Sequence, residues 1–516
     1  MQIEDLNPQL VERLESEGVD LDRMLRFLDD LNSGKFDNQL TVVPETVPSL
    51  DNPAIVDRTK PASVTVSLVE ARAKFAELGI ALDPLSIVSP ASAGGAGGAG
   101  AETVTFDEAA LRLIGIHLYP KTAYGVLNGG SASTYADFKK NREYADGLFD
   151  EYRDLFDRLA GECRGRPKGI TPAFINPDGS PGYSFLLLKM RMLLEHRKLY
   201  AETTGNSARD VLPSFQMTSV HTDGAIGEAY RDYVTRPELK ALADSLGCPS
   251  IEMFTETQSM MAAITHSSEG SPRRIFDRAY GKANTGLAMP GGHGQNFEIL
   301  APIYRRMHSL GIRYAWLGNI DNMGFTVDPV SLAIFALSGK EAAFEEAWRT
   351  PMDVKGGILV CDRAGKLTCA DIGPAISTED VLAFEKSGKP VLFNCGVGLF
   401  DLDRLIPRLD DLPYQLPLRV TDQDKDAGRY AQAEQITWEI IALMDDPLFF
   451  AVDKTKRFLA AKMLMENILT SLPPQGAPSR GDGQASVSAM LHEGLIQLLA
   501  NEYALVLEND RWILPH

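Results

Sequence analysis

The features that mark membrane-bound and secreted proteins are missing from this sequence. No run of about 18 apolar residues occurs, so no membrane-spanning helix is predicted. The opening residues, MQIEDLNPQLVERL, have neither the basic nor the apolar region of a secretory signal. The five cysteines form no CxxC pair and are predicted to be reduced thiols. We therefore expect a cytoplasmic protein with no membrane partner.

An excess of basic residues is also missing. The chain has 51 Lys and Arg against 70 Asp and Glu, a formal charge of −19. Nucleic-acid surfaces need the opposite balance, so no nucleic-acid partner is expected. A polyphosphate substrate is still compatible, because a few focused lysines and a metal ion are enough to bind it.

Several catalytic motifs are absent as well. There is no Walker A loop, no HExxH, no GxSxG and no zinc-type spacing of Cys and His. These absences argue against a zinc enzyme and against a hydrolase with a covalent nucleophile. Phosphoryl-group chemistry that depends on positioning and charge needs none of these motifs.

The 516 residues suffice for two or three domains. The first thirty residues have the apolar spacing of two short helices. Residues 89–101, SPASAGGAGGAGA, have the composition of a flexible linker, and a second Pro- and Gly-rich break covers 471–486. The first linker contains a GxGxxG match at 95–100. No strand precedes this match, so we interpret it as linker and not as a dinucleotide fingerprint.

Short apolar runs alternate with helical patterns between residues 103 and 421. Helical spacing covers 183–199 and 296–310. The runs predicted as strands are 124–128, 215–220, 313–319, 357–361 and 390–394. This alternation predicts the α/β class, with a Rossmann-like, mostly parallel mixed sheet flanked by helices. We expect a helical N-terminal region at 1–102, a catalytic domain at 103–421 and a small C-terminal region at 422–516. In such a sheet, the ligand site lies at the carboxyl ends of the strands.

Polar motifs follow several of these predicted strands. Gly129 and Gly130 leave backbone N–H groups open to a phosphate, although a tight turn explains them equally well. Lys168 follows a proline in a loop, where it could hold a triphosphate or simply be solvated. Asp321 comes after the strand at 313–319, a common place for a hard cation, with an Asx turn as the alternative.

Later motifs are also rich in glycine or lysine. Residues 290–295, PGGHGQ, leave one histidine in a backbone-rich loop that suits either a ligand or a plain turn. Lys355 precedes two glycines and a strand. Residues 454–462, KTKRFLAAK, place four cations close together, which a solvated helix face would also explain.

The order of these motifs resembles the eukaryotic-type UDP-glucose pyrophosphorylase family and its UDP-sugar and UDP-N-acetylhexosamine relatives. The resemblance covers roughly residues 120–470 and implies a fold of the nucleotidyltransferase type A kind. The segments, each with the family motif that it resembles, are Leu127–Gly130 for LNGG, Pro167-Lys168 for a Pro-Lys pair, Met217–Ser219 for Met-Asn-Ser, Gln258-Ser259 for a Gln-Ser pair, Pro290–Gln295 for PPGHGD, Asn319–Gly324 for NSDNLG, Asp353–Gly357 for DVKGG, Phe393-Asn394 for the first half of FNTN and Arg457–Lys462 for RFLPVK. Of the longer motifs after LNGG, DVKGG is the one reproduced in full.

The resemblance implies transfer of a uridylyl group from UTP to a sugar 1-phosphate, with glucose 1-phosphate as the expected substrate and Mg²⁺ as the cofactor. The implied catalytic lysines are Lys168, Lys355 and Lys462, and the implied metal ligand is Asp321. The nucleotide would be bound by Asn128, Gly129, Gly130, Gln258 and Gly292. The sugar phosphate and sugar would be bound by His293, Asn322 and Asn394.

Two departures from the family pattern carry expectations. Ala132 replaces a glycine of the family loop, which predicts altered phosphate contacts if that position needs a positive φ. About 33 residues separate Ser133 from Arg166, a longer insertion than the family pattern predicts. Two alternatives stay open: another sugar 1-phosphate as substrate, and a non-catalytic protein that binds nucleotide sugars. The oligomeric state and the role of the N-terminal helices are open as well.

Overall fold

The structure is a computed structural model of the whole chain, and it describes residues 2–39, 43–88, 102–132, 134–145, 147–248, 253–474 and 483–515. The predicted linker at 89–101, with its GxGxxG match, lies outside these ranges. Of the second predicted linker, residues 475–482 lie outside them.

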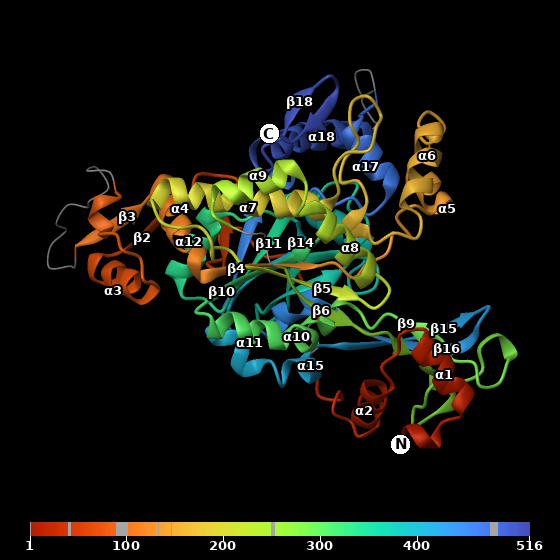
Figure 1. Cartoon of the computed structure of the whole chain (residues 1–516). Helices are drawn as coiled ribbons and strands as arrows, with labels where there is room; N and C mark the ends of the chain where they lie inside the picture. The colour runs from red at the N-terminus through yellow and green to blue at the C-terminus, as the bar shows by residue number, and fades with distance from the viewer. Residues whose placement is uncertain are drawn as a thin grey trace.

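A central mixed sheet runs through the molecule (Figure 1). Its strand order is β1 (Ile55–Asp57), β17 (Pro447–Val452), β11 (Ala342–Trp348), β14 (Leu392–Asp401), β10 (Tyr314–Asn319), β4 (Thr122–Leu127), β5 (Ser214–Ser219) and β6 (Met253–Gln258). Only β14 runs against its neighbours on this path, and β12 (Gly357–Cys361) and β13 (Leu367–Asp371) extend the sheet from β14. The predicted α/β class and mostly parallel sheet are confirmed.

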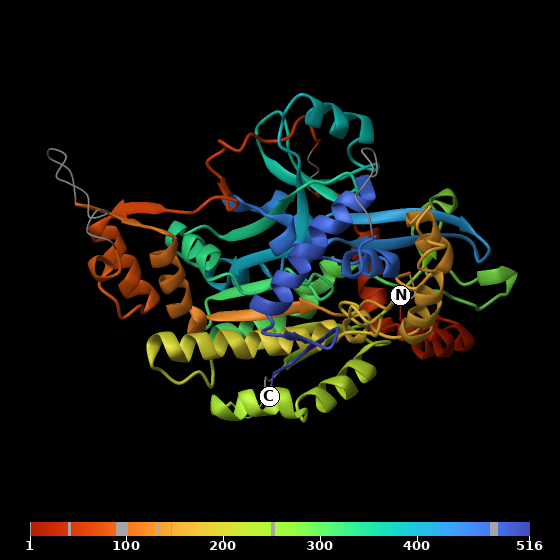
Figure 2. The ribbon, with the colours of Figure 1, turned by 90° about the horizontal axis from the view of Figure 1, so that it is seen from above.

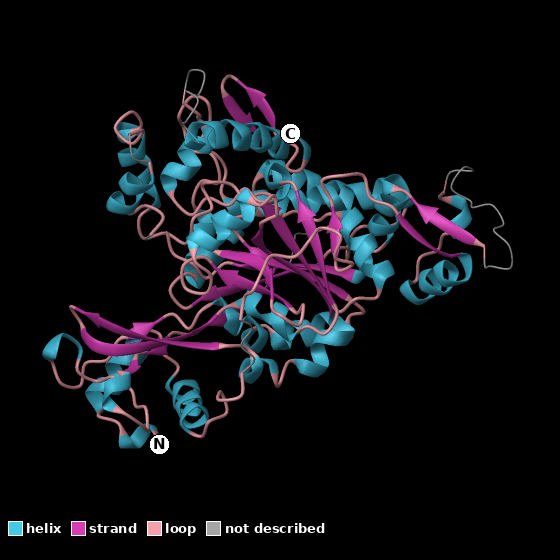
Figure 3. Ribbon diagram, turned by 180° about the vertical axis from the view of Figure 1, so that it is seen from behind, coloured by secondary structure: helices cyan, strands magenta, loops and turns pink. Residues whose placement is uncertain are grey.

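Helices cover both faces of this sheet, as Figures 1 and 3 show from opposite sides. One face carries α4 (Glu108–His117), α7 (Phe185–Thr204) and α12 (Pro329–Ser338), and the other carries α10 (Asn296–Ile299) and α11 (Ala301–Ser309). Strand β4 shows why the sequence has continuous apolar runs. Tyr124 and Val126 pack in the core of one face and Ala123 and Leu127 in that of the other. Strands buried on both faces lose the alternation of apolar and polar residues.

The predicted N-terminal helices are α1 (Pro8–Ser16) and α2 (Leu21–Asn32). The side chains of Asn7 and Asp20 cap their first turns. Leu14 and Leu25 pack against an arm formed by β15 (Leu418–Lys425), β16 (Gly428–Gln435) and β8 (Ile264–Thr265). The helices therefore brace a hairpin arm, which Figure 1 shows beside them.

The C-terminal residues pack over the end of the sheet, as the view from above shows (Figure 2). Helix α18 (Gly483–Asn501) lies on α16 (Lys454–Arg457) and α17 (Leu464–Ser471). Insertion helices α5 (Phe138–Tyr144) and α6 (Arg153–Cys163) share one apolar cluster with α17. Strands β1 and β17 lie outside 103–421 yet belong to the central sheet. The predicted division into domains stays a prediction.

Parallel strands β4, β5 and β10 end side by side at Leu127, Ser219 and Asn319, and the predicted site motifs follow these ends. Within the described ranges, no helix combines the length and apolar character needed to cross a bilayer.

The crossing of α4 and α12 generates a test of this packing. A Cβ added at Gly115 would lie 1.8 Å from the carbonyl oxygen of Pro329, whereas nothing lies within 4 Å of a Cβ added at Gly161 on α6. Gly115→Ala should lower the free energy of unfolding by about 1–3 kcal/mol or more through overpacking. Gly161→Ala should raise it by up to about 1 kcal/mol through helix propensity. Urea denaturation of both variants checks this; equal effects of the two substitutions would contradict the described crossing.

Candidate active site

The turn after β10 places Asp321 against Lys168. The Lys168 ammonium lies 3.2 Å from Oδ2 of Asp321, although the two residues are 153 positions apart. It also donates to the carbonyl oxygen of Ala461, and it lies 4.2 Å from the centre of the Tyr135 ring. Lys168 is only 8% exposed. Segments of three predicted motifs, those of Lys168, Asp321 and Ala461, therefore meet at the Lys168 ammonium group. This group is bound by protein groups and is not a solvated loop charge.

Asn322 fastens this turn to the segment before Lys462. Its side chain is fully buried. The Nδ2 group donates to the Arg457 carbonyl at 3.0 Å, and Oδ1 accepts from the N–H of Leu459 at 3.1 Å and of Gly324 at 3.0 Å. Its hydrogen bonds are thus made to backbone. Asn319, at the end of β10, is the other asparagine of the same motif, and it lines the cavity described below.

A buried lysine supports the same turn from α7. Lys189 donates to the carbonyl oxygens of Asn322 and Phe325, each at 2.7 Å, and to the hydroxyl of Tyr503 at 3.2 Å. Burial lowers the pKa of Lys189 well below its ordinary value. The Tyr503 hydroxyl in turn donates to the Met323 carbonyl at 2.6 Å. The C-terminal residues thus reach the underside of the Asp321 turn.

The predicted glycine loop is paired with the segment that carries Lys168. The N–H of Lys168 donates to the Gly130 carbonyl at 2.9 Å, and Ser219 Oγ donates to the Gly129 carbonyl at 3.0 Å. Asn128 is fully buried and donates to Gln216 Oε1 at 3.0 Å, so its side chain supports the loop from beneath. A Cβ at Gly169 would lie 2.1 Å from Asn128 Oδ1, which explains the glycine there.

Ala132 does not need a glycine's conformation. It is absent from the described residues with positive φ. Its methyl group is fully buried in the cluster formed by the insertion helices and α17. The positive φ on which the expected change in phosphate contacts depended is therefore not found at Ala132, and the effect of this residue on phosphate binding stays a prediction.

The two remaining residues that were predicted to bind the nucleotide contact each other. Gln258 Nε2 donates to the Gly292 carbonyl and to Gln295 Oε1, both at 2.8 Å. Arg23 of α2 donates to the same Gln295 oxygen at 3.2 Å and pairs with Glu298 at 2.6 Å. The N-terminal helices are therefore linked to the PGGHGQ loop.

His293 is held in one tautomer. Its Nδ1 accepts from the N–H of Thr437 at 3.1 Å, and the Thr437 hydroxyl donates to the His293 carbonyl at 2.9 Å. An acceptor Nδ1 leaves the ring proton on Nε2. Burial and, secondarily, the positive charge of Arg419 lower the pKa of His293 to about 4. The ring is neutral at pH 7 and offers an N–H donor.

A cavity of about 200 Å³ brings four predicted residues together. His293, Asn322, Asn394 and Lys462 all contribute to its wall. Asn394 Nδ2 donates to Oε1 of buried Glu346 at 2.9 Å, and Asn394 Oδ1 accepts from the Gly396 N–H at 2.8 Å. Burial raises the pKa of Glu346 well above its ordinary value. We name this space the distal cavity.

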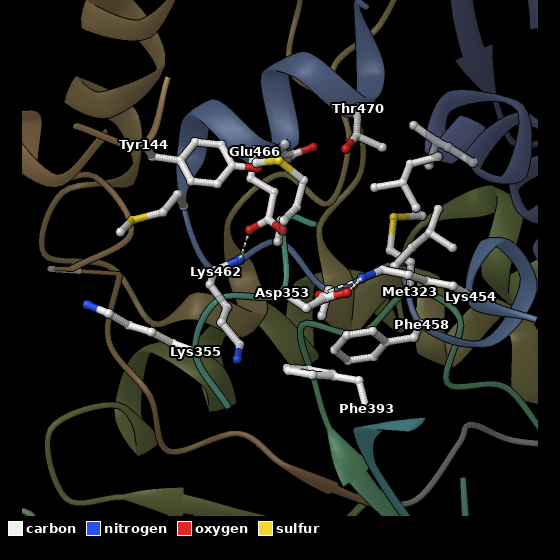
Figure 4. A pocket seen from close by; sticks show the side chains of 18 of the residues that line it. Tyr144, Met323, Asp353, Lys355, Phe393, Lys454, Phe458, Lys462, Glu466 and Thr470 are labelled. Atoms are coloured by element: carbon white, nitrogen blue, oxygen red, sulfur yellow. Dashed lines mark hydrogen bonds and ion pairs between the residues drawn. The ribbon is translucent and has the colours of Figure 1, made fainter. Parts of the chain in front are cut away.

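Lys355 lies in a neighbouring cleft that also contains Lys462 (Figure 4). Both lysines are exposed, and neither forms an ion pair with any described residue. In the picture, their ammonium groups lie to one side of the pair between Asp353 and Lys454. Lys462 therefore connects the cleft and the distal cavity. Asn128, Gly129, Gly130 and Gln258 line neither space.

Sequence reasoning missed several residues here. It favoured a solvated face for the run at 454–462, yet Lys454 is buried against the Asp353 carboxylate and Arg457 is paired with buried Glu345 at 2.6 Å. Apolar neighbours on both sides of the run were the available signal. Other wall residues that no motif indicated are Asp371, Arg419, Trp438 and Glu439.

The depressed pKa of His293 predicts an acid-sensitive contribution to stability. An unfolded histidine titrates near pH 6.5, so the folded chain binds fewer protons than the unfolded chain between about pH 6.5 and 4. The stability contributed by neutral His293 is therefore complete above pH 6.5 and is lost as the pH falls towards 4. Relative to His293→Gln, the wild type should lose about 2 kcal/mol of unfolding free energy between pH 7 and 5. Denaturant titrations at both pH values measure this; parallel curves for the two proteins would refute it.

The hydroxyl of Tyr503 gives a second test. Tyr503→Phe removes one hydrogen bond to the Met323 carbonyl and leaves the buried Lys189 ammonium with two acceptors. We expect a loss of about 1–3 kcal/mol of unfolding free energy. Tyr280→Phe, at a side chain 60% exposed, is the matched control and should change little. An equally small effect at Tyr503 would show that the turn does not depend on this support.

Comparison with known proteins adds an independent line of evidence. A model of the UTP–glucose-1-phosphate uridylyltransferase family matches residues 206–472. This range is just over half of the chain and includes His293, Asp321, Lys355, Asn394 and Lys462. No curated protein sequence matches the chain.

Solved structures share the fold at low sequence identity. UDP-N-acetylglucosamine pyrophosphorylase from Trypanosoma brucei, in complex with an inhibitor, is 15% identical over 96% of this chain and 85% of its own, with a TM-score of 0.54. A point mutant of UDP-glucose pyrophosphorylase from Leishmania major is 14% identical over 100% of this chain and 83% of its own, with a TM-score of 0.52. The chain belongs to the UTP–glucose-1-phosphate uridylyltransferase family and is a nucleotidyltransferase.

Proposed function

We propose that this protein transfers the uridylyl group of UTP to glucose 1-phosphate, giving UDP-glucose and pyrophosphate. A phosphate oxygen of the sugar phosphate attacks the α-phosphorus of UTP, and the bond from that phosphorus to the bridging oxygen of pyrophosphate breaks. The nucleophile is already an anion, so no general base is required. The protein has to align two polyanions and offset their repulsion.

One observation carries this proposal: cationic and carboxylate groups from four distant segments, with His293 from a fifth, lie near one another at one edge of the sheet. Lys168 contacts Asp321 and Ala461, Lys462 follows Ala461, and Lys462 shares one space with Lys355 and another with His293. Such convergence is what a reaction between two phosphate-bearing substrates needs. A plain structural role would not explain two exposed, unpaired lysines beside a buried Lys–Asp pair.

The residues around Asp321 fit a magnesium ion. Among the described residues, no group of three or more His, Cys, Asp or Glu side chains could hold a metal alone. Mg²⁺ in nucleotide enzymes usually takes one or two protein carboxylates and completes its shell with substrate phosphates and water. Asp321 would supply the carboxylate, through the oxygen that does not face Lys168. When bound, the ion would neutralise charge on both phosphate groups.

The remaining residues take roles that follow from their positions. Lys168 would draw charge from the triphosphate, while the exposed Lys355 and Lys462 would bind the sugar 1-phosphate. The PGGHGQ loop and Gln258 would bind the base, with Gly129 and Gly130 beside it. His293 would donate from Nε2, and Asn394 would contact a sugar hydroxyl.

Glucose 1-phosphate is the proposed sugar substrate, and an N-acetylhexosamine 1-phosphate is the alternative within the same reaction. The distal cavity, where the sugar would bind, includes Trp438, Phe393 and Phe458 in its wall. The second candidate is a protein that binds nucleotide sugars without turnover. The two exposed lysines in the cleft speak against it, since binding alone does not require two unpaired lysines.

Pyrophosphate release with Mg²⁺, UTP and a panel of sugar 1-phosphates tests the proposal. We expect turnover with glucose 1-phosphate. Asp321→Ala and Lys355→Ala should each lower kcat/KM by about 100-fold or more, because each removes a group that stabilises transferring charge. Lys386→Ala, an exposed lysine on α13 (Thr378–Lys386), is the matched control and should leave kcat/KM unchanged.

The outcomes separate the candidates. Asp321→Asn guards against misfolding, because it retains an oxygen that can accept from Lys168; its melting temperature should stay near that of the wild type. Full activity in both alanine variants would remove the proposed site. If the protein binds UTP but turns over none of the sugar phosphates, the second candidate, a nucleotide-sugar binding protein without catalytic activity, is favoured.

A further inference from the structure

The wall of the distal cavity contains an ion cluster that no motif indicated. Arg419, at the start of β15, donates from Nη1 to Asp371 Oδ2 at 2.7 Å. It also donates from Nε and Nη2 to Glu439 Oε1, at 3.0 and 2.7 Å. Asp371 ends β13, and Glu439 lies in the short helix Thr437–Leu443. Three distant segments therefore place these side chains in the same cavity as Asn394 and His293.

All three guanidinium nitrogens of Arg419 are engaged by carboxylates. The edge formed by Nε and Nη2 is the one that normally grips a carboxylate ligand in a bidentate manner, and Glu439 occupies it. Asp371 occupies the remaining nitrogen. The cluster has a formal charge of −1 with both carboxylates ionised, and of zero with Glu439 protonated. In neither state does it present net positive charge to a ligand.

One oxygen of the cluster is still without a partner. Oε2 of Glu439 is buried and makes no hydrogen bond to any described residue. Burial raises the pKa of this carboxyl group, and Arg419 opposes the shift. A sugar hydroxyl can donate or accept, so it would satisfy the oxygen in either protonation state. A sugar carboxylate placed beside Glu439 would instead face another carboxyl oxygen, and the Arg419 guanidinium would already be paired.

We propose that the Arg419–Asp371–Glu439 cluster is a specificity determinant. It selects sugar 1-phosphates whose sugar ring carries no charged group and rejects uronic acid 1-phosphates. This inference rests on the proposed function, because it assigns the distal cavity to the sugar. The carboxyl group of Glu439, which forms part of the cavity wall, binds a hydroxyl of the sugar. The occupied Arg419 edge denies a binding site to a sugar carboxylate, and Lys462, the other cation of the cavity, is directed to the 1-phosphate.

Competition between glucose 1-phosphate and glucuronic acid 1-phosphate tests the proposal. The wild type should prefer glucose 1-phosphate by about 100-fold or more in kcat/KM, since an unpaired carboxylate beside this cluster is costly. Glu439→Ala frees the Nε and Nη2 edge of Arg419. It should shift the ratio of the two kcat/KM values at least about tenfold towards the uronic acid. Glu439→Gln, which retains the volume but not the charge, should shift the ratio in the same direction by less.

Asp424→Asn is the matched control, because it removes one negative charge from the exposed far end of the same hairpin. It should leave the ratio unchanged. A wild type that uses both sugars equally, or a ratio that stays constant in both Glu439 variants, would overturn the inference. Calorimetric binding of UDP-glucose and UDP-glucuronic acid separates this failure from failure of the proposed function. If no turnover is found, tighter binding of UDP-glucose than of UDP-glucuronic acid, reduced in Glu439→Ala, would still support the role of the cluster. Equal affinity of the wild type for both ligands would refute it.

Discussion

The position of Asp321 depends on a turn that is fastened by buried hydrogen bonds from three directions. Asn322 binds the backbone at 457–459, Lys189 of α7 binds two carbonyls of the turn, and Tyr503 binds a third. Buried polar groups with all partners in place specify one arrangement, because any displacement leaves a group unsatisfied. These hydrogen bonds fix the turn and therefore the position of the Asp321 carboxylate. A site that aligns two repelling substrates needs this rigidity.

The cations near this turn divide into two classes. Lys168 and Lys454 are buried and each contacts a carboxylate, so their charge is largely matched within the protein. Lys355 and Lys462 are exposed and have no ion-pair partner among the described residues. In a chain of formal charge −19, unpaired lysines at a cleft concentrate positive potential where the rest of the surface repels phosphate. Under the proposed function, the exposed Lys355 and Lys462 would therefore attract the sugar phosphate more strongly than the buried Lys168 and Lys454.

The sheet could be predicted from sequence where strands are continuous apolar runs, as in β4 and β10. Strand β11, AAFEEAW, escaped prediction because buried Glu345 and Glu346 interrupt its apolar run. Their partners Arg457 and Asn394 are distant in sequence. The resemblance implied that Lys168 and Asp321 belong to one site, but it did not predict their direct contact. Which lysine of 454–462 is buried could not be predicted, since its partner Asp353 lies a hundred residues away. Long-range partners are what a single sequence conceals.

The segments to which the sequence assigned no role prove to support the site. Tyr135, in the long insertion, lies under the Lys168 ammonium, and its helices pack on α17. Helix α17 supplies Glu466, whose carboxylate accepts from the backbone N–H of Lys462 at 2.8 Å. Arg23 of the N-terminal helices is bound to the loop that contains His293. The insertion, tail and N-terminal helices therefore each support one segment of the proposed site. Variation in these regions can alter the site without changing the residues proposed to bind the substrates.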